Sequence, residues 1–234
     1  MKKFCLVFFT CSLMLLLSSG ILWATPIKSY TSVLNTGPLI DFEGYTEGTL
    51  FGTQFSGVTF GEASSSGLPK IDSYNTSSWQ YGYGSSSGNN VLTAINGLSV
   101  FGITATFSTP QFWVQAFLSD TSPHGNYTVQ IFGSGNVLLE SLTVSSSEIL
   151  PPGYSGGYKP VPGTTPLPGI YVGFIRPTAD IVSVQFGPSS IAYGNAFAID
   201  DLRLDPPAVP EPGTLLLLGS GIIGLWGLRK KFKK

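Results

Sequence analysis

The sequence predicts an all-β protein whose body is a single two-sheet β-sandwich of the jelly-roll kind. From Leu39 to Leu204 the apolar residues come in short runs rich in Val, Ile, Phe, Tyr and Thr, separated by Gly, Ser, Asn and Pro. This is the pattern of strands joined by turns. No segment of the body keeps the 3.6-residue apolar period of a helix. About ten short strands in about 165 residues favour one sandwich with its own core.

The expected strands follow one another along the body at turn-like intervals. They lie near Leu39 to Phe42, Val58 to Phe60, Leu98 to Phe101, Ile103 to Phe107, Phe112 to Phe117, Tyr127 to Phe132, Val137 to Val144, Ile170 to Phe174, Ile181 to Phe186 and Phe197 to Leu204. The stretch Phe132-Gly-Ser-Gly-Asn-Val137 predicts a hairpin, because Gly and Asn tolerate positive φ. Two longer segments, Ser64 to Asn90 and Ser145 to Gly169, are expected to be surface excursions.

The N-terminus has the pattern of a secretory signal peptide. Lys2 and Lys3 precede an uncharged apolar stretch from Phe4 to about Trp23. We expect a signal peptide over residues 1–24, cleaved after Ala24 or, as the other option, after Gly20; an uncleaved anchor is the alternative. Cys5 and Cys11 are the chain's two cysteines, and both lie inside this leader, so the exported body has no thiol or disulfide chemistry.

The body is acidic. Between Thr25 and Val209 there are 12 Asp and Glu residues against five Lys and Arg, which gives 5 − 12 = −7. A body with so few basic residues has no electrostatic footprint for nucleic acid. Its charge suits an extracellular protein that holds a hard cation.

The residue inventory argues against an enzyme. The single histidine, His124, lies in the turn Ser122-Pro123-His124-Gly125-Asn126, which is a poor setting for the base of a Ser-His-Asp site. A glycoside hydrolase needs two carboxylates across a cleft, and sequence spacing leaves that option open. We therefore expect a non-catalytic protein, with a secreted carbohydrate-active enzyme that uses Asp and Glu as the alternative.

Four acidic residues are set among strand residues near the two ends of the body. They are Asp41, Glu43, Asp200 and Asp201. In a jelly roll the first and last strands often pair, which would bring these carboxylates together. Clustered carboxylates repel unless a cation neutralises them, and with carbonyl oxygens they form the kind of site that Ca²⁺ prefers. The sequence therefore predicts a structural calcium ion.

Strand alternation assigns faces to these segments. It places Ile40 and Phe42 on one face and Asp41 and Glu43 on the other. In the last strand it groups Phe197, Ile199 and Asp201 opposite Ala198, Asp200 and Leu202. The alternative is that Asp200 and Asp201 cap a strand, face solvent or pair with Arg203.

Both acidic segments resemble a known group of domains. Asp41-Phe42-Glu43 and Ala198-Ile199-Asp200-Asp201-Leu202 are similar to the ends of galactose-binding-like and carbohydrate-binding jelly rolls. In those domains a Glu and an Asp at matching places help to ligate a structural calcium. The resemblance covers about ten residues and implies Glu43 and Asp201 as the first ligands, with Asp41 and Asp200 next.

Aromatic residues gather in the first polar segment. Tyr74, Trp79, Tyr81 and Tyr83 could form a platform for carbohydrate, since pyranose rings stack on aromatic faces. The alternative is that these side chains pack against the sandwich as a satellite cluster.

The C-terminus combines three features. Pro210, Glu211 and Pro212 precede an uncharged run from Thr214 to Leu228, and five basic residues lie in the last six positions. The run is near the lower length limit for a membrane-spanning helix. The basic cluster orients it with the tail in the cytoplasm and the body outside. We expect a transmembrane helix over residues 214–228, preceded by an accessible, proline-stiffened peptide.

This order of features resembles the PEP-CTERM sorting signal of Gram-negative bacteria that make exopolysaccharide. The resemblance implies recognition and cleavage at Pro210-Glu211-Pro212 by a membrane-embedded exosortase. It also implies transient contact with the inner membrane, delivery to the cell surface or matrix, and association with exopolysaccharide. A simple tail anchor is the alternative. The chain is then divided into a signal peptide (1–24), an extracytoplasmic domain (25–208) and a sorting signal (209–234).

Overall fold

The structure is a computed structural model of the chain. It describes residues 23–63, 67–73, 86–88, 90–96, 99–100, 102–120, 126–149, 169–188 and 197–205. The predicted signal peptide up to residue 22 and the predicted transmembrane helix at 214–228 lie outside these residues. Within the described ranges, no helix is long and apolar enough to cross a membrane.

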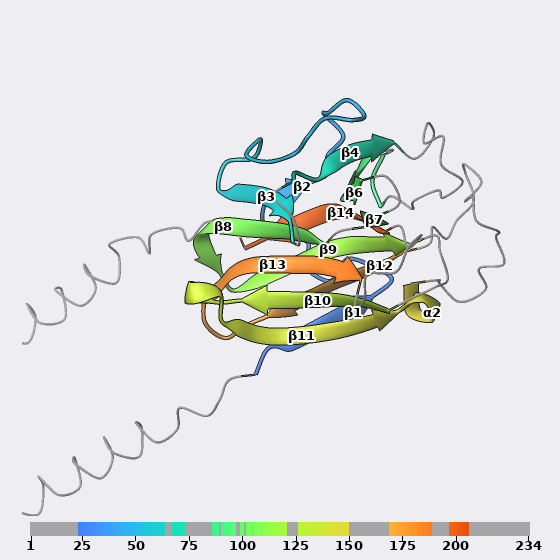
Figure 1. Cartoon of the computed structure of the whole chain (residues 1–234). Coiled ribbons are helices and arrows are strands. Elements are labelled where there is room, and N and C mark those ends of the chain that lie inside the picture. The colour runs from blue at the N-terminus through green and yellow to red at the C-terminus, as the bar shows by residue number, and fades with distance from the viewer. Residues whose placement is uncertain are drawn as a thin grey trace, which may run out of the picture.

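Two antiparallel sheets form the body (Figure 1). The seven-stranded sheet contains, in spatial order, β1 (Thr25–Ser29), β12 (Ile170–Ile175), β9 (Trp113–Asp120), β14 (Phe197–Leu204), β5 (Asn90–Thr93) and β4 (Lys70–Ser73), and β2 (Leu39–Ile40) also pairs with β14. The five-stranded sheet contains β11 (Leu138–Ser145), β10 (Asn126–Phe132), β13 (Ile181–Pro188), β8 (Ile103–Gln111) and β3 (Val58–Glu62). A small ladder pairs β6 (Ile95–Asn96) with β7 (Ser99–Val100). The helical elements described are η1 (Ser134–Asn136) and α2 (Ser146–Ile149).

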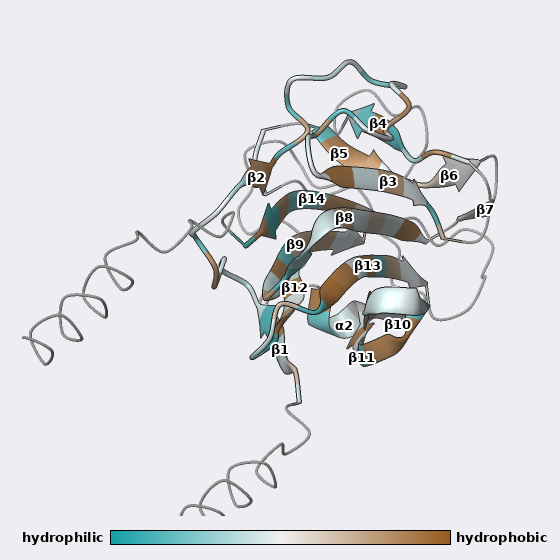
Figure 2. Ribbon diagram, turned by 90° about the vertical axis from the view of Figure 1, so that its left-hand side faces the viewer, coloured by the Kyte–Doolittle hydropathy of each residue, from teal (hydrophilic) through white to brown (hydrophobic). Residues whose placement is uncertain are grey.

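The core lies between the two sheets. Alternate residues of β9, Val114, Ala116 and Leu118, are fully buried in it, as are Val129 and Ile131 of β10. In Figure 2 the hydrophobic stretches run along strands such as β5 and β13. The all-β prediction is confirmed, and the arrangement is consistent with the predicted sandwich. Consecutive strands β8, β9 and β10 alternate between the sheets, in keeping with jelly-roll winding.

Each of the ten predicted strands has a counterpart in the structure, and the predicted hairpin is present. Strand β10 pairs with β11 around η1, where Gly135 has φ 71° and Asn136 has φ 60°. The run from Leu39 forms only the two-residue β2, and β7 covers the middle of the run predicted near Leu98.

Four strands were not predicted: β1, β4, β5 and β6. Strands β1 (TPIKS) and β4 (KIDS) lie at the two edges of the seven-stranded sheet. Edge strands carry charged residues and proline, so their sequences lack the apolar pattern of a strand. The Ser64 to Asn90 segment is therefore only partly a surface excursion, because it contains β4, which pairs with β5.

A β-bulge in β14 overturns the face assignment made from alternation. Phe197, Ile199 and Leu202 all lie in the core, whereas strict alternation predicts Leu202 on the opposite face. The pairing of β14 with β9 shifts register between Asp200 and Arg203, and Asp201 has φ 48°. An extra residue of this kind bends the strand locally. Asp200 and Asp201 therefore both fall between the core residues Ile199 and Leu202.

Candidate functional site

The run that was predicted as the first strand forms β2, and it lies beside the last strand, β14, as predicted. Ile40 is paired with Leu202, and Leu39 with Arg203. Ile40 and Phe42 both face the core, which confirms their predicted face. Phe42 has φ 61°, so the chain turns sharply between Asp41 and Glu43. This pairing brings both acidic segments to the same part of the seven-stranded sheet.

Asp200 is buried beneath residues 86–88. Its side chain has no exposed surface. Its Oδ2 accepts hydrogen bonds from the backbone N–H groups of Ser86 (2.9 Å) and Ser87 (3.0 Å) and from the Ser86 hydroxyl (3.1 Å). Its Oδ1 accepts one from the backbone N–H of Asp201 (2.8 Å). The carboxylate therefore ties this short segment to the sheet.

Asp201 binds the same segment through its side chain. The Ser87 hydroxyl donates to Oδ1 of Asp201 (2.8 Å), and the Tyr171 hydroxyl donates to its Oδ2 (3.2 Å). The Tyr171 ring packs edge-on against Phe117 with centroids 5.2 Å apart. Asp201 is 5% exposed, so the alternative in which these two aspartates face solvent is wrong.

Glu43 holds the other end of the segment. Its carboxylate lies directly against Gly88, and its Oε1 accepts a hydrogen bond from the backbone N–H of Asn90 (2.7 Å). Gly88 has φ 52°. Asp41 has a local role, since its Oδ1 accepts from the backbone N–H of Glu43 (3.3 Å).

The side-chain amide of Asn90 donates hydrogen bonds to three backbone carbonyl oxygens. Its Nδ2 donates to the carbonyl oxygens of Phe42 (3.2 Å), Glu43 (3.4 Å) and Tyr45 (2.8 Å). One side chain on β5 therefore fixes the turn that follows β2.

Burial controls the electrostatics of this cluster. It raises the pKa of Asp200 to about 7; the N–H of Ser87 opposes that rise, and the nearby Asp201 adds to it. Burial also raises the pKa of the Tyr171 hydroxyl. Asp200 therefore holds its proton more tightly than a solvated aspartate does.

The four predicted calcium ligands form two groups by their contacts, Asp200 with Asp201 and Glu43 with Asp41. Asp200 and Asp201 contact Ser86 and Ser87, while Glu43 contacts Gly88 and Asn90. Across the described part of the chain, no three His, Cys, Asp or Glu residues form a group that could hold a metal ion. The oxygen-only donor set is of the kind that calcium accepts, so calcium stays a prediction.

Three partners in this cluster were not predicted from the sequence: Ser86, Ser87 and Asn90. They lie in a Ser- and Gly-rich stretch that gives no periodic signal. Their return to the sheet depends on the long-range pairing of β5 with β4 and with β14, in which Ser73 is opposite Asn90 and Ile199 is opposite Leu92.

The predicted carbohydrate platform, Tyr74, Trp79, Tyr81 and Tyr83, lies outside the described residues, as do Pro210, Glu211 and Pro212. The ends of the segment that carries the four aromatics are nevertheless described. They are Ser73 on β4 and residues 86–88, which the carboxylates hold.

Comparison with known proteins identifies the C-terminal signal. Residues 208–231 match the PEP-CTERM protein-sorting motif, which confirms the resemblance found in the sequence and implies an exported protein. No curated protein sequence matches the chain.

Solved structures give distant matches to the body. The K2 cleaved adhesin domain of Lys-gingipain is 18% identical, with a TM-score of 0.47 over 73% of this chain and 99% of that chain. TmCBM61 in complex with β-1,4-galactotriose is 13% identical, with a TM-score of 0.38 over 65% of this chain and 90% of that chain.

Proposed function

We propose that this chain is an exported, non-catalytic surface or matrix protein of a Gram-negative bacterium. An exosortase recognises its PEP-CTERM signal, and its β-sandwich associates with exopolysaccharide. The observation that carries the proposal is the PEP-CTERM match at residues 208–231. It agrees with the proline-stiffened peptide, the apolar run and the basic cluster at the end of the chain.

The contacts of the acidic residues support a non-catalytic role. Asp200 and Asp201 are buried, and their oxygens accept hydrogen bonds from the backbone and hydroxyl groups of Ser86 and Ser87. Glu43 is engaged in the same way by Asn90. Carboxylates that hold a loop in place contribute to stability rather than to acid–base chemistry.

The proposal includes a structural calcium ion, with Glu43 and Asp201 as first ligands and Asp41 and Asp200 as the next. What supports it is that the pairing of β2 with β14 brings the two acidic segments to one part of the sheet, where their side chains offer only oxygen donors. The ion would add a second link between the two ends of the body.

The sorting role is tested by replacing Pro210, Glu211 and Pro212 with Ala in a host that carries an exosortase. We expect the substituted chain to keep its tail and to accumulate in the inner membrane, while the parent chain is shortened and reaches the surface. Pro206→Ala/Pro207→Ala is the matched control, because these prolines precede the motif and should leave processing intact. Normal processing of the Pro210/Glu211/Pro212 variant would refute exosortase sorting.

The non-catalytic role is tested separately. We expect the full chain to release no reducing sugar from the host's exopolysaccharide. Turnover that disappears when Asp200→Asn or Glu43→Gln is introduced would instead establish a carbohydrate-active enzyme.

A further inference from the structure

The outer face of the five-stranded sheet is built from aligned polar residues. Val58, Phe60, Ile103, Ala105 and Phe107 point into the core, so their neighbours along β3 and β8 point outward. Residues that are directly opposite in neighbouring strands share a face. One row across the strands therefore consists of Thr59, Thr106, Ser183, Phe132 and Leu138, and the next consists of Gly61, Thr104, Gln185, Gln130 and Ser141.

This face is open and carries no charge among its described residues. Thr59, Thr106 and Ser141 are exposed, Gln130 and Gln185 are partly exposed, and Ser183 in the middle of the first row is buried. In Figure 1 the strands β8, β13, β10 and β11 lie in front of the other sheet, with no described element across them. None of the outward positions in either row is Asp, Glu, Lys or Arg, although the body has a net charge of about −7 from its ionisable residues.

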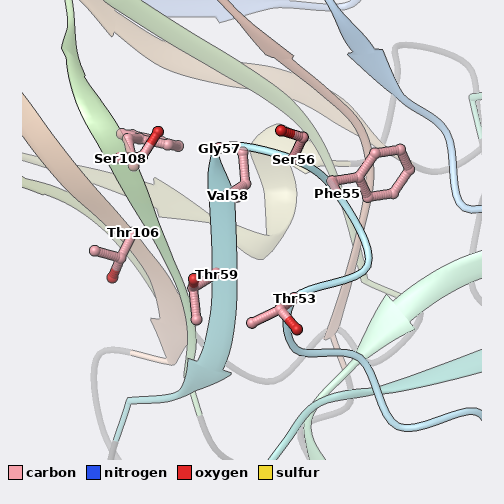
Figure 3. A pocket seen from close by; sticks show the side chains of 9 residues that line it. Thr53, Phe55, Ser56, Gly57, Val58, Thr59, Thr106 and Ser108 are labelled. Atoms are coloured by element: carbon pink, nitrogen blue, oxygen red, sulfur yellow. The ribbon is translucent and has the colours of Figure 1, made fainter.

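A groove continues the first row beyond its β3 end. It has a volume of about 300 Å³ and is lined by Thr53, Phe55, Ser56, Thr59, Thr106 and Ser108, among others. Figure 3 shows these hydroxyl-bearing side chains around the start of β3, with the Phe55 ring on the neighbouring loop. Thr59 and Thr106 belong to both the groove and the row, so the two features form one surface.

The Phe55 ring is held in place by two other aromatic rings. It contacts Phe51, with ring centroids 5.7 Å apart, and Tyr45, with centroids 6.0 Å apart. Phe132 and Leu138 lie at the far end of the first row, on β10 and β11. With strands spaced about 4.8 Å apart, the part of the row from β3 to β10 spans roughly 14 Å.

We propose that this surface, the two rows together with the groove, binds a neutral polysaccharide chain that lies across the strands. The inference rests on the proposed association with exopolysaccharide and names the site and the class of glycan. Amide and hydroxyl groups both donate and accept hydrogen bonds, which matches the hydroxyls of a sugar. Charge complementarity selects a neutral chain, because an anionic polymer needs Lys or Arg and this face has neither.

The test uses the full chain in a mild neutral detergent and affinity electrophoresis. The neutral probes are dextran, laminarin and galactomannan, and the anionic probe is alginate. We expect at least one neutral probe to slow migration and alginate to have no effect. Gln130→Ala/Gln185→Ala removes the central amides and should weaken binding about tenfold, from the loss of two sets of hydrogen bonds.

A second variant adds charge without crowding. A Cβ at Gly61 meets no atom within 4 Å, so Gly61→Asp should fold normally while placing a carboxylate on the face and reducing binding. Ser134→Asp adds the same charge in the exposed hairpin turn and is expected to bind as the parent does. Equal melting temperatures exclude unfolding as the cause.

Each remaining outcome overturns the inference in a recognisable way. Binding that survives both face variants but is lost in Trp79→Ala would place the glycan on the aromatic segment, leaving the proposed function intact. Retardation by none of the four probes would refute both the face and the glycan association. Preference for alginate would refute the neutral class. Concentration-dependent dimerisation abolished by Gly61→Asp, without glycan binding, would identify a second copy of this chain as the occupant.

Discussion

The carboxylate of Glu43 occupies the space in which a Cβ of residue 88 would lie, so Gly88 is the residue that allows the two to pack. Gly88 also has φ 52°, a conformation that residues with a side chain rarely adopt. Position 88, in the segment held by Asp200 and Asp201, therefore requires glycine for two reasons: the space that Glu43 fills and the positive φ of the backbone.

Gly88→Ala is expected to lower the free energy of unfolding by about 1–3 kcal/mol, because the new methyl group must displace Glu43 and strain the backbone. Chemical denaturation measures the change. Gly44→Ala is the control, since a Cβ at Gly44 meets nothing within 4 Å. In Gly88→Ala/Glu43→Ala the steric part of the loss should be recovered; a double variant with no recovery would contradict the role given to Glu43.

Two glycines in strands should respond in opposite directions to the same substitution. A Cβ at Gly173 of β12 would overlap the backbone carbonyl of Val114 on β9, whereas a Cβ at Gly61 of β3 meets open space. We expect Gly173→Ala to destabilise the fold by about 1–3 kcal/mol. Gly61→Ala should stabilise it by up to about 1 kcal/mol, because Ala loses less backbone entropy than Gly. Thermal melting of both variants measures these changes. Similar shifts of the two melting temperatures would show that β12 and β9 are not tightly packed at Gly173.

The ion pair between Lys28 on β1 and Glu148 on α2 predicts an acid-sensitive contribution to stability. Their charged atoms are 2.8 Å apart. The hydrogen bond from Lys28, with that from the N–H of Ser145, lowers the pKa of Glu148 from 4.5 to about 2. A lowered carboxyl pKa contributes stability that is fully present above the unfolded value of 4.5 and is lost as the pH falls through 2.

The contribution is expected to stay within about 1 kcal/mol, since both side chains are partly exposed and water screens the pair. The measurement is the free energy of unfolding in urea from pH 5 to pH 2 for the parent chain and for Glu148→Gln. We expect the gap between the two to close as the pH falls. Parallel curves would mean that the ion pair contributes no stability.

The calcium prediction has a direct thermodynamic test. If an ion links Glu43 and Asp201, calcium raises the melting temperature of the full chain and a chelator lowers it, because a ligand that binds only the folded state stabilises that state. Glu43→Gln should abolish the calcium-induced shift. Asp205→Asn, which removes a carboxylate next to the C-terminal end of β14, should leave it unchanged. A melting temperature that changes with neither calcium nor chelator rules the ion out.

The sequence was informative wherever a strand has one buried face. Strands such as β10, with its alternating Tyr127, Val129 and Ile131 in the core, follow a period of two, and the Gly-Asn turn after β10 has a local chemical signal. Strands β1 and β4 do not, because their pairing at the sheet edges depends on distant segments rather than on their own pattern.

The acidic cluster was predictable in part. The pairing of the chain's two acidic segments follows from the general winding of such folds, and β2 does lie beside β14. The bulge at Asp201 could not be predicted, since a positive φ at an aspartate has no signature in a single sequence. The contacts of Ser86 and Ser87 depend on that bulge, which brings both carboxylates under the same segment.

Strand β14 joins the two parts of the seven-stranded sheet, with β12 and β9 on one side and β5 and β4 on the other. Ribosomes make this strand after every other strand of the body, and its last residue, Leu204, lies only a few positions before the sorting motif that starts at residue 208. On the proposed export route, the sheet would close only when translocation is nearly finished. Closure of the sheet and exposure of the sorting motif to the exosortase would then be nearly simultaneous.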